Sequence, residues 1–184
     1  QWRVGGDAGP RLDKAWAEEA GLGWIGKHSN VIHSQRGSWM VIGHLLTTEA
    51  LEPDEPARSL CGRCTTCIDA CPTDAIREPF VVDARRCLPF HTIENREAEL
   101  PVAIANALGP WVAGCDICQD VCPWNQGSLP SSSDPEMQPR PWLMELNNSD
   151  LQAWDDATWD DNLRGSALRR IKPWMWRRNA QAAH

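Results

Sequence analysis

A short helix is the first element that the pattern of apolar positions predicts. Between residues 11 and 20, the apolar residues Leu12, Ala15 and Trp16 recur at the spacing that places them on one helical face. Gly21 follows this segment and is a residue type that often ends a helix. We therefore expect a helix over residues 11–20 with one apolar face.

Two apolar runs after this helix are typical of a β-hairpin. Residues 30–33 and 38–42 flank the segment 34–37, which has the length and the glycine of a hairpin loop. The second run continues apolar through Leu46, which indicates a strand in the centre of a sheet. The acidic, proline-containing segment 52–56 is expected to be a linker.

The rest of the chain alternates short elements with loops. We expect a short helix at residues 73–76, a strand at residues 80–83, and then a helix capped by Asp83. Another helix is expected at residues 97–108. Residues 127–141, rich in serine and proline, are expected to form a loop before a helical tail. The sequence thus predicts an α+β fold.

The cysteines form two strings with the spacing of iron–sulfur ligands. The first string is Cys61-x2-Cys64-x2-Cys67-x3-Cys71-Pro72, and after Cys87 the second is Cys115-x2-Cys118-x3-Cys122-Pro123. In two-cluster bacterial ferredoxins, the cysteine before the proline ligates the other cluster. We therefore expect two [4Fe-4S] clusters, one held by Cys61, Cys64, Cys67 and Cys122, and the other by Cys71, Cys87, Cys115 and Cys118. Zinc sites and disulfides are the alternatives, and the cysteine spacing favours iron–sulfur clusters over both of them.

Composition and charge narrow the setting of the protein. The 184 residues suffice for a hydrophobic core, and no apolar run has the length of a membrane span. The net charge of -7 gives no overall attraction to nucleic acid, so such a contact needs a local basic patch. Reduced cysteines imply a cytoplasmic protein. Because the chain begins at Gln1 and not at methionine, we expect that an N-terminal segment is missing.

Two further segments carry candidate chemistry. Residues 21–27 match G-x-G-x-x-G by letter, but the motif follows a predicted helix, whereas a dinucleotide site follows a strand. Tight turns explain these glycines better than a ligand does.

In the tail, basic residues and tryptophans occur from Arg164 to Arg178 without an acidic residue. Arginine beside aromatic side chains suits phosphate contact and base stacking, while a solvated helix face is the alternative.

Joined to their flanks, the cysteine strings resemble those of the epoxyqueuosine reductases, cobalamin-dependent enzymes of queuosine biosynthesis in tRNA. The matching stretches run through nearly the whole chain, at residues 20–27, 61–72, 83–87, 92–94, 114–119, 122–125, 164–167 and 178–180. A generic ferredoxin would share neither the glycine and tryptophan stretch upstream nor the basic tail downstream.

This resemblance implies an oxidoreductase that removes the epoxide oxygen from epoxyqueuosine at the wobble position of tRNA. Electrons would pass through the two clusters to cobalamin, and Asp7 would donate a proton. The implied cobalamin contacts are Asp7, Gly23, Trp24, Gly26, His28 and Val31. The implied tRNA contacts are Arg169, Arg170, Lys172, Arg177 and Arg178. The implied partners are a tRNA anticodon stem-loop and a flavodoxin or ferredoxin as electron donor, for a cytoplasmic monomer without membrane contact.

The resemblance also suggests a division of the chain. Residues 1–51 would be the C-terminal part of a cobalamin-binding catalytic domain, residues 52–126 a ferredoxin-like domain with two [4Fe-4S] clusters, and residues 127–184 a linker and helical tRNA-contacting tail. Two other functions remain open, a ferredoxin-type electron carrier and a reductive dehalogenase-like cobalamin enzyme. Cobalamin binding separates the carrier from both enzymes, and the basic tail separates the tRNA enzyme from the dehalogenase.

Overall fold

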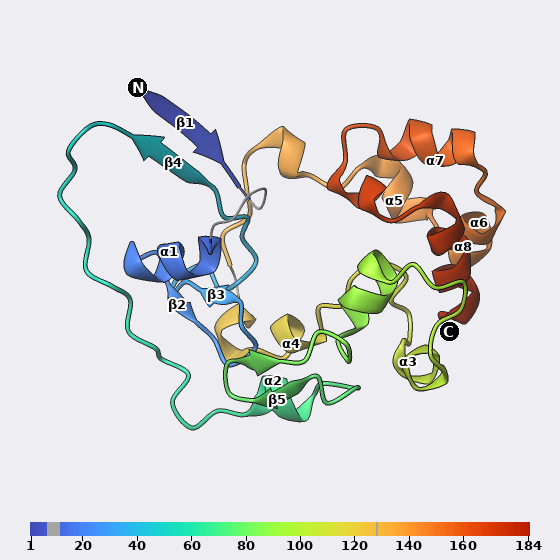
Figure 1. Ribbon diagram of the computed structural model, residues 1–184, viewed down its shortest axis with the longest axis horizontal. Coiled ribbons are helices and arrows are strands. Elements are labelled where there is room, and N and C mark those ends of the chain that lie inside the picture. Colours follow the sequence, from blue (N-terminus) through green and yellow to red (C-terminus); the bar gives the residue numbers. More distant parts are fainter. Residues whose placement is uncertain (7–11, 128) are drawn as a thin grey trace. The chain divides into compact units, whose positions relative to one another are not determined.

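The computed structural model describes residues 1–6, 12–127 and 129–184, which combine helices with short strands (Figure 1). Contacts within the chain define two compact units. Unit 1 comprises residues 1–71, 76–82 and 117–130, and unit 2 comprises residues 72–75, 83–116 and 131–184. These units cut across the domain boundaries that the sequence suggested.

Unit 1 contains, among its described residues, three antiparallel sheets of two strands each. The strand β1 (Trp2–Gly5) pairs with β4 (His44–Thr47), β2 (Trp24–Ile25) pairs with β3 (Val31–Ile32), and β5 (Ile76–Glu78) pairs with β6 (Val81–Val82). The helices of this unit are α1 (Asp13–Glu19), α2 (Thr66–Asp69), α4 (Ile117–Asp120) and the 3-10 turn η2 (Pro123–Asn125).

The predicted hairpin of residues 30–42 is confirmed only at its turn, where His33 and Gly37 form an isolated antiparallel bridge. β3 pairs with β2, the strand before it in the sequence. In the turn between them, Ser29 has a φ of 66° and the Gly26 amide donates to the Asn30 carbonyl at 2.8 Å. Residues 38–42 form no strand, and β4 pairs with the distant β1 instead. Leu45 in β4 is 61% exposed, so this strand is not central to a sheet.

Of the two helices predicted at residues 11–20 and 73–76, the first is confirmed and the second is not. α1 forms as expected, but its buried residue is Ala17, while Leu12 and Trp16 are exposed. The helix predicted at residues 73–76 is wrong, because Asp74 has a φ of 49°, outside the helical region, and Ile76 begins β5.

Asn125 fastens residues 117–130 to the N-terminal part of unit 1. Its Nδ2 donates to Ser38 Oγ and to the Gln119 carbonyl, each at 2.8 Å, and its Oδ1 accepts the Ser38 amide hydrogen at 2.6 Å. A Cβ on Gly37 would lie 2.1 Å from this Oδ1, so only glycine allows the approach. The second cysteine string therefore packs in part with residues from the start of the chain.

Unit 2 is mainly helical, as predicted for the tail. Its elements are the π-helix η1 (Phe90–Glu94), α3 (Val102–Ala107), the 3-10 turn η3 (Pro135–Met137), α5 (Pro141–Glu145), α6 (Asn148–Ala153), α7 (Asp156–Leu163), the 3-10 turn η4 (Ala167–Arg170) and α8 (Pro173–Ala182). Its core gathers apolar side chains from α6, α7 and α8, among them Leu151, Leu163 and Met175. The helix predicted at residues 97–108 begins only after Pro101.

Candidate functional site

A cavity of about 280 Å³ in unit 1 is lined by four of the predicted cluster ligands. Cys61 and Cys64 lie in the loop before α2, Cys67 lies in α2, and Cys122 directly precedes η2. The remaining lining residues are Lys27, His28, Ile32, Leu60, Pro123 and Trp124. The structure thus brings together the set of thiols that the rule for cysteine before proline assigned to one cluster.

Burial and mutual proximity change the pKa values of the thiols in this cavity. Burial raises the pKa of Cys67, and the neighbouring thiols Cys122, Cys61 and Cys64 raise it further. Burial also raises the pKa of Cys122. Cys64 differs, because its hydrogen bond with Thr66 lowers its pKa. Thiolates that destabilise one another in this way are stabilised when they bind iron, so these residues fit an iron–sulfur cluster.

Lys27 holds the loop that carries the first two of these cysteines. Its Nζ donates to the carbonyls of Gly62 at 2.9 Å and Cys64 at 2.8 Å. This contact could not be predicted from the sequence, because Lys27 stands far from the cysteines along the chain and belongs to the glycine motif. The ammonium group fixes the loop and places a positive charge beside the thiols.

His28 also lines the cavity and is 5% exposed. Its Nδ1 accepts the amide hydrogen of Asn30 at 3.1 Å, while its Nε2 is buried without a hydrogen-bond partner among the described residues. Burial lowers the pKa of His28, and the charge of Lys14 lowers it further. The imidazole is therefore neutral near pH 7 and, with Nδ1 as an acceptor, carries its hydrogen on Nε2.

The other four predicted ligands are divided between the units. Cys71 and Cys118 belong to unit 1, and Cys87 and Cys115 belong to unit 2. All eight cysteines lie in the described part of the chain, and none of them forms a disulfide. The pairing of these four around a second cluster stays a prediction.

The positions predicted to contact cobalamin are mostly packed against the protein itself. Trp24 is 2% exposed and Val31 is 3% exposed. A Cβ at Gly23 would lie 2.3 Å from the Ile32 carbonyl oxygen, and one at Gly26 would lie 2.6 Å from Ile32 Cδ1. These glycines thus allow β2 and β3 to approach closely, as expected for tight turns. Asp7 lies outside the described residues.

An apolar hollow of about 950 Å³ lies elsewhere in unit 1, between α1 and the segment that leads into β4. Trp16 of α1 and Leu12, which directly precedes α1, line it together with Leu45 and Leu46 of β4. These four side chains are also among the exposed large apolar residues of the chain. Exposed apolar surfaces of this kind mark places where a protein binds a ligand or another segment of polypeptide.

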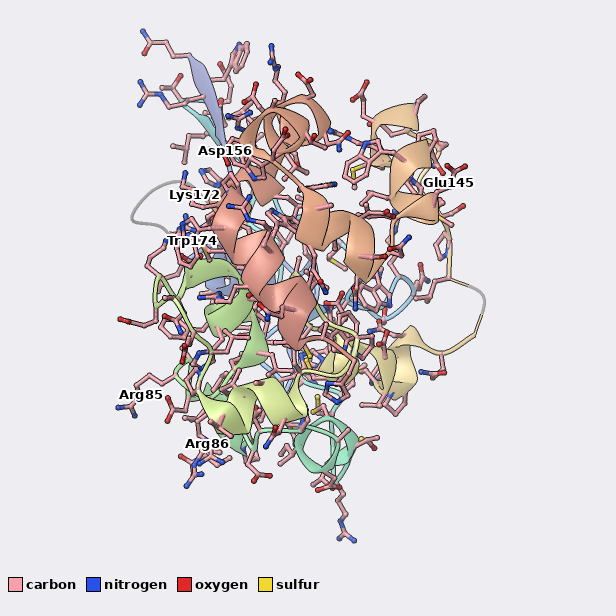
Figure 2. All side chains as sticks on the ribbon, turned by 90° about the vertical axis from the view of Figure 1, so that its right-hand side faces the viewer. Arg85, Arg86, Glu145, Asp156, Lys172 and Trp174 are labelled. Carbon is pink, nitrogen blue, oxygen red and sulfur yellow. The ribbon has the colours of Figure 1, made fainter. Side chains whose placement is uncertain are left out.

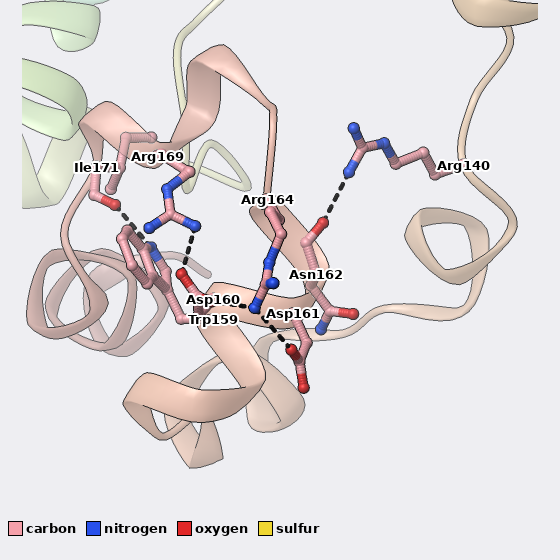
Figure 3. Close-up of polar contacts among 8 residues, drawn as sticks. All are labelled: Arg140, Trp159, Asp160, Asp161, Asn162, Arg164, Arg169 and Ile171. Carbon is pink, nitrogen blue, oxygen red and sulfur yellow. Dashed lines mark hydrogen bonds and ion pairs between the residues drawn. The ribbon is translucent and has the colours of Figure 1, made fainter.

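The five basic residues predicted to contact tRNA differ in how far their charges are already used. Arg169 pairs with Asp160 and lies 4.4 Å from the centre of the Trp159 ring (Figure 3). Arg170 pairs with Glu94, and Arg177 donates to the Trp154 carbonyl at 2.7 Å. These contacts leave parts of each guanidinium at the surface.

Of the five basic residues, Arg178 makes the most contacts within the described part of the protein, and Lys172 makes the fewest. The Arg178 guanidinium donates to the carbonyls of His91 and Asn95, and burial lowers its pKa. Its role is therefore largely structural. Lys172 is exposed beside Trp174 at the start of α8 (Figure 2), and no contact of its ammonium group is recorded within the described residues. Among the five, Lys172 is the most available to an external phosphate.

No group of three His, Cys, Asp or Glu side chains among the described residues is arranged to hold a single metal ion. The described helices also include none with both the length and the apolar character that crossing a membrane requires.

The cysteine spacing and the cavity define a protein of the iron–sulfur class. Residues 60–125 match the family model described as a 4Fe-4S double cluster binding domain, so the chain has sites for two iron–sulfur clusters. The chain is 77% identical over 99% of its length to an epoxyqueuosine reductase of Synechococcus sp. (strain CC9605), and covers 57% of that protein. It is 45% identical over 94% of its length to the epoxyqueuosine reductase of Vibrio cholerae, of which it covers 46%.

Solved structures give the same result. A crystal structure of epoxyqueuosine reductase with an epoxyqueuosine-modified tRNA-Tyr stem loop matches 99% of this chain at a TM-score of 0.91 and 31% identity, and the match covers 48% of that protein. The structure of the reductase from Streptococcus thermophilus matches at a TM-score of 0.83 and 31% identity, over 99% of this chain and 47% of that protein. Over nearly its whole length the chain is similar to epoxyqueuosine reductases, and it spans about half the length of the relatives that it matches.

Proposed function

We propose that the protein to which this chain belongs reduces epoxyqueuosine to queuosine at the wobble position of tRNA. The observation that carries this proposal is the likeness to epoxyqueuosine reductases over 99% of the chain, in sequence and in fold. The grouping of Cys61, Cys64, Cys67 and Cys122 around one cavity supports it, because the reaction requires an electron carrier.

The reaction consumes two electrons and two protons and releases the epoxide oxygen as water, leaving a carbon–carbon double bond. Two [4Fe-4S] clusters would supply the electrons, one held by Cys61, Cys64, Cys67 and Cys122 and the second by Cys71, Cys87, Cys115 and Cys118. Cobalamin, when bound, supplies the metal chemistry at the epoxide. Asp7 donates a proton, because a carboxyl group buried beside a corrin and a base has a raised pKa and stays protonated near neutrality.

The described residues allow only a limited contribution to cobalamin binding. Trp24 and Val31 are buried, and Gly23 and Gly26 pack against Ile32, so these four contribute through their main chain. We propose Asp7, His28 and parts of the longer protein for the remaining contacts. In this proposal residues 1–51 complete a cobalamin-binding domain, residues 52–126 carry the clusters, and residues 127–184 contact tRNA.

The proposed partners follow from the same chemistry. The anticodon stem-loop of tRNA is the substrate, and the basic residues of the tail contact its phosphates. A flavodoxin or ferredoxin supplies single electrons to the clusters. The proposed setting is the cytoplasm, where tRNA and these donors occur, and the proposed state is a monomer.

A substitution at Asp7 tests this function. In the full-length protein purified without oxygen, Asp7→Asn should retain iron and cobalamin, while epoxide reduction slows by about 10²–10⁴-fold, as for the loss of a general acid. Undiminished turnover would remove Asp7 from the mechanism. A wild-type protein that takes up iron but no cobalamin and leaves the modified stem-loop unchanged would instead indicate an electron carrier.

A further inference from the structure

Trp174, near the start of α8, keeps part of its indole ring at the surface of unit 2. It is 36% exposed, whereas Trp176 is 4% exposed and belongs to the core of this unit. Of the tryptophans that the structure describes in unit 2, Trp174 is the most exposed. Packing in the core therefore explains Trp176 but not the whole side chain of Trp174.

The ring of Trp174 is held in place by Arg178, which lies one turn further along α8. The Arg178 guanidinium is 5.3 Å from the centre of the ring and lies over it. This guanidinium also donates to the carbonyls of His91 at 2.8 Å and Asn95 at 3.0 Å, which fix it to unit 2. A ring that is already ordered loses little conformational entropy when a planar partner stacks on it.

Positive charge without an acidic counterpart accompanies this ring along the helix. Lys172 is the N-cap of α8 and lies on the same side of unit 2 as Trp174 (Figure 2). Its ammonium group makes no hydrogen bond or ion pair with the residues that the structure describes. From Lys172 to Ala182 the sequence has three basic residues and no acidic residue. An aromatic face beside a cation is the arrangement with which proteins bind unpaired nucleotides.

We propose that Trp174 stacks on an unpaired base of the tRNA anticodon loop, while Lys172 contacts a neighbouring phosphate. Bases of the loop are available for stacking, whereas bases of the stem are paired and stacked on one another. Stacking on an indole ring depends little on which base is bound, so this contact holds the loop without reading its sequence. The inference rests on the proposed function, because it requires tRNA as the substrate.

Binding of an anticodon stem-loop to the full-length, iron-loaded protein tests the stack. Trp174→Leu should weaken the affinity about tenfold and leave the salt dependence unchanged, because stacking releases no counterions. Trp174→Phe keeps an aromatic face and should retain most of the affinity. Lys172→Gln should instead reduce the slope of log affinity against log salt by about 0.7–0.9. Trp39→Leu is the matched control, since Trp39 is 47% exposed but belongs to unit 1.

Cross-linking tests the contact in the unsubstituted protein. Stem-loops that carry 5-iodouridine at one position each are irradiated with the full-length protein, and mass spectrometry identifies the attached peptide. We expect a peptide with Trp174 for at least one position of the loop and for none of the stem. If Trp174→Leu lost iron or thermal stability, the affinity of Trp174→Phe and this cross-link would decide.

The outcomes separate this inference from the proposed function. Wild-type affinity in Trp174→Leu, or an equal loss in Trp39→Leu, would overturn the stack while leaving tRNA as the substrate. Unchanged affinity with slower reduction by the electron donor would assign the Trp174 ring to a protein partner and would also overturn it. A full-length protein that binds no stem-loop would refute the proposed function itself.

Discussion

Asn179 in α8 donates from its Nδ2 to the carbonyl of Thr92 at 2.9 Å, and both residues are fully buried. The same amide group donates to the Val112 carbonyl at 2.8 Å. The neighbouring Arg178 donates to the carbonyls of His91 and Asn95. Two consecutive residues of α8 thus donate hydrogen bonds to carbonyl groups of the π-helix η1 and of the segment after it.

Replacing Asn179 with alanine should therefore destabilise the protein substantially. Two buried carbonyls lose their donor, and we expect a loss of about 2–3 kcal/mol in the free energy of unfolding. Urea unfolding of the iron-loaded protein measures this. Gln181→Ala is the matched control, because Gln181 is exposed on the same helix and should change stability little. Equal effects of the two substitutions would contradict the assignment.

The ligand grouping predicts a selective effect of Cys122→Ala. Loss of this thiolate should damage the cluster of Cys61, Cys64 and Cys67 and leave the other cluster intact. Iron content and the EPR spectrum of the reduced protein report this, and the iron content should fall by no more than half. Damage confined to the cluster that includes Cys115 and Cys118 would show that the pairing is different.

The contacts of Lys27 predict slower release of iron from the wild-type protein than from Lys27→Met. Without its ammonium group, the carbonyls of Gly62 and Cys64 lose their donor, and the loop that carries Cys61 and Cys64 becomes more mobile. The rate at which a chelator removes iron measures this. Lys14→Met provides the control, since Lys14 donates to the Ser29 carbonyl and Asn30 Oδ1 outside that loop. Equal rates for both variants would exclude a specific role of Lys27.

Local signals in the sequence predicted part of this structure well. The spacing of cysteines and prolines grouped Cys122 with a distant string, and the structure places that group around one cavity. The short helix before Gly21 also follows from local residues. By contrast, β1 pairs with β4, which lies about forty residues further along the chain, and no local sequence pattern indicates such a pairing.

The errors and omissions at the site have the same physical origin. The apolar run of residues 38–42 was interpreted as a strand, although Val41 is 82% exposed, because apolar content alone does not reveal what covers a side chain. Lys27 ends the glycine motif of residues 21–27, which suggested turns or a ligand, and His28 follows it directly. Their places in the cysteine cavity depend on the β2 and β3 hairpin, which the sequence did not predict.

The different exposures of the basic residues refine the prediction for tRNA binding. Changing Arg170, Lys172 and Arg177 to glutamine should weaken binding of the anticodon stem-loop and reduce the slope of log affinity against log salt by about 2, because phosphate contacts release counterions. Arg178 is left unchanged, since its loss would disturb the fold. Iron content should stay constant.

A second triple variant provides the control for net charge. Arg36, Arg58 and Arg77 are exposed outside the tail, and their change to glutamine removes the same charge. If both triple variants lose affinity equally, the tail has no specific role.

Asp160 predicts a pH dependence in unit 2. Hydrogen bonds from Arg169, the larger contribution, and from Arg164 lower the pKa of Asp160 below the ordinary aspartate value of 3.8 (Figure 3). A lowered folded-state pKa gives stability that is present above 3.8 and is lost as the pH falls through the folded value. Asp160→Asn should thus lower the melting temperature slightly at pH 7, and the two curves should converge in acid. The effect is small because the pair is at the surface. A difference independent of pH would contradict this account.

The cysteine cavity also determines when a newly made chain can receive its cluster. Cys61, Cys64 and Cys67 leave the ribosome together, but Cys122 follows only after residues 72–75 and 83–116 of unit 2 have been synthesised. Until then the early loop carries three of the four thiols of the cavity. Assembly of this cluster on the complete set is therefore a step that follows synthesis of residues 61–125, and the three early thiols are open to oxidation for as long as that takes.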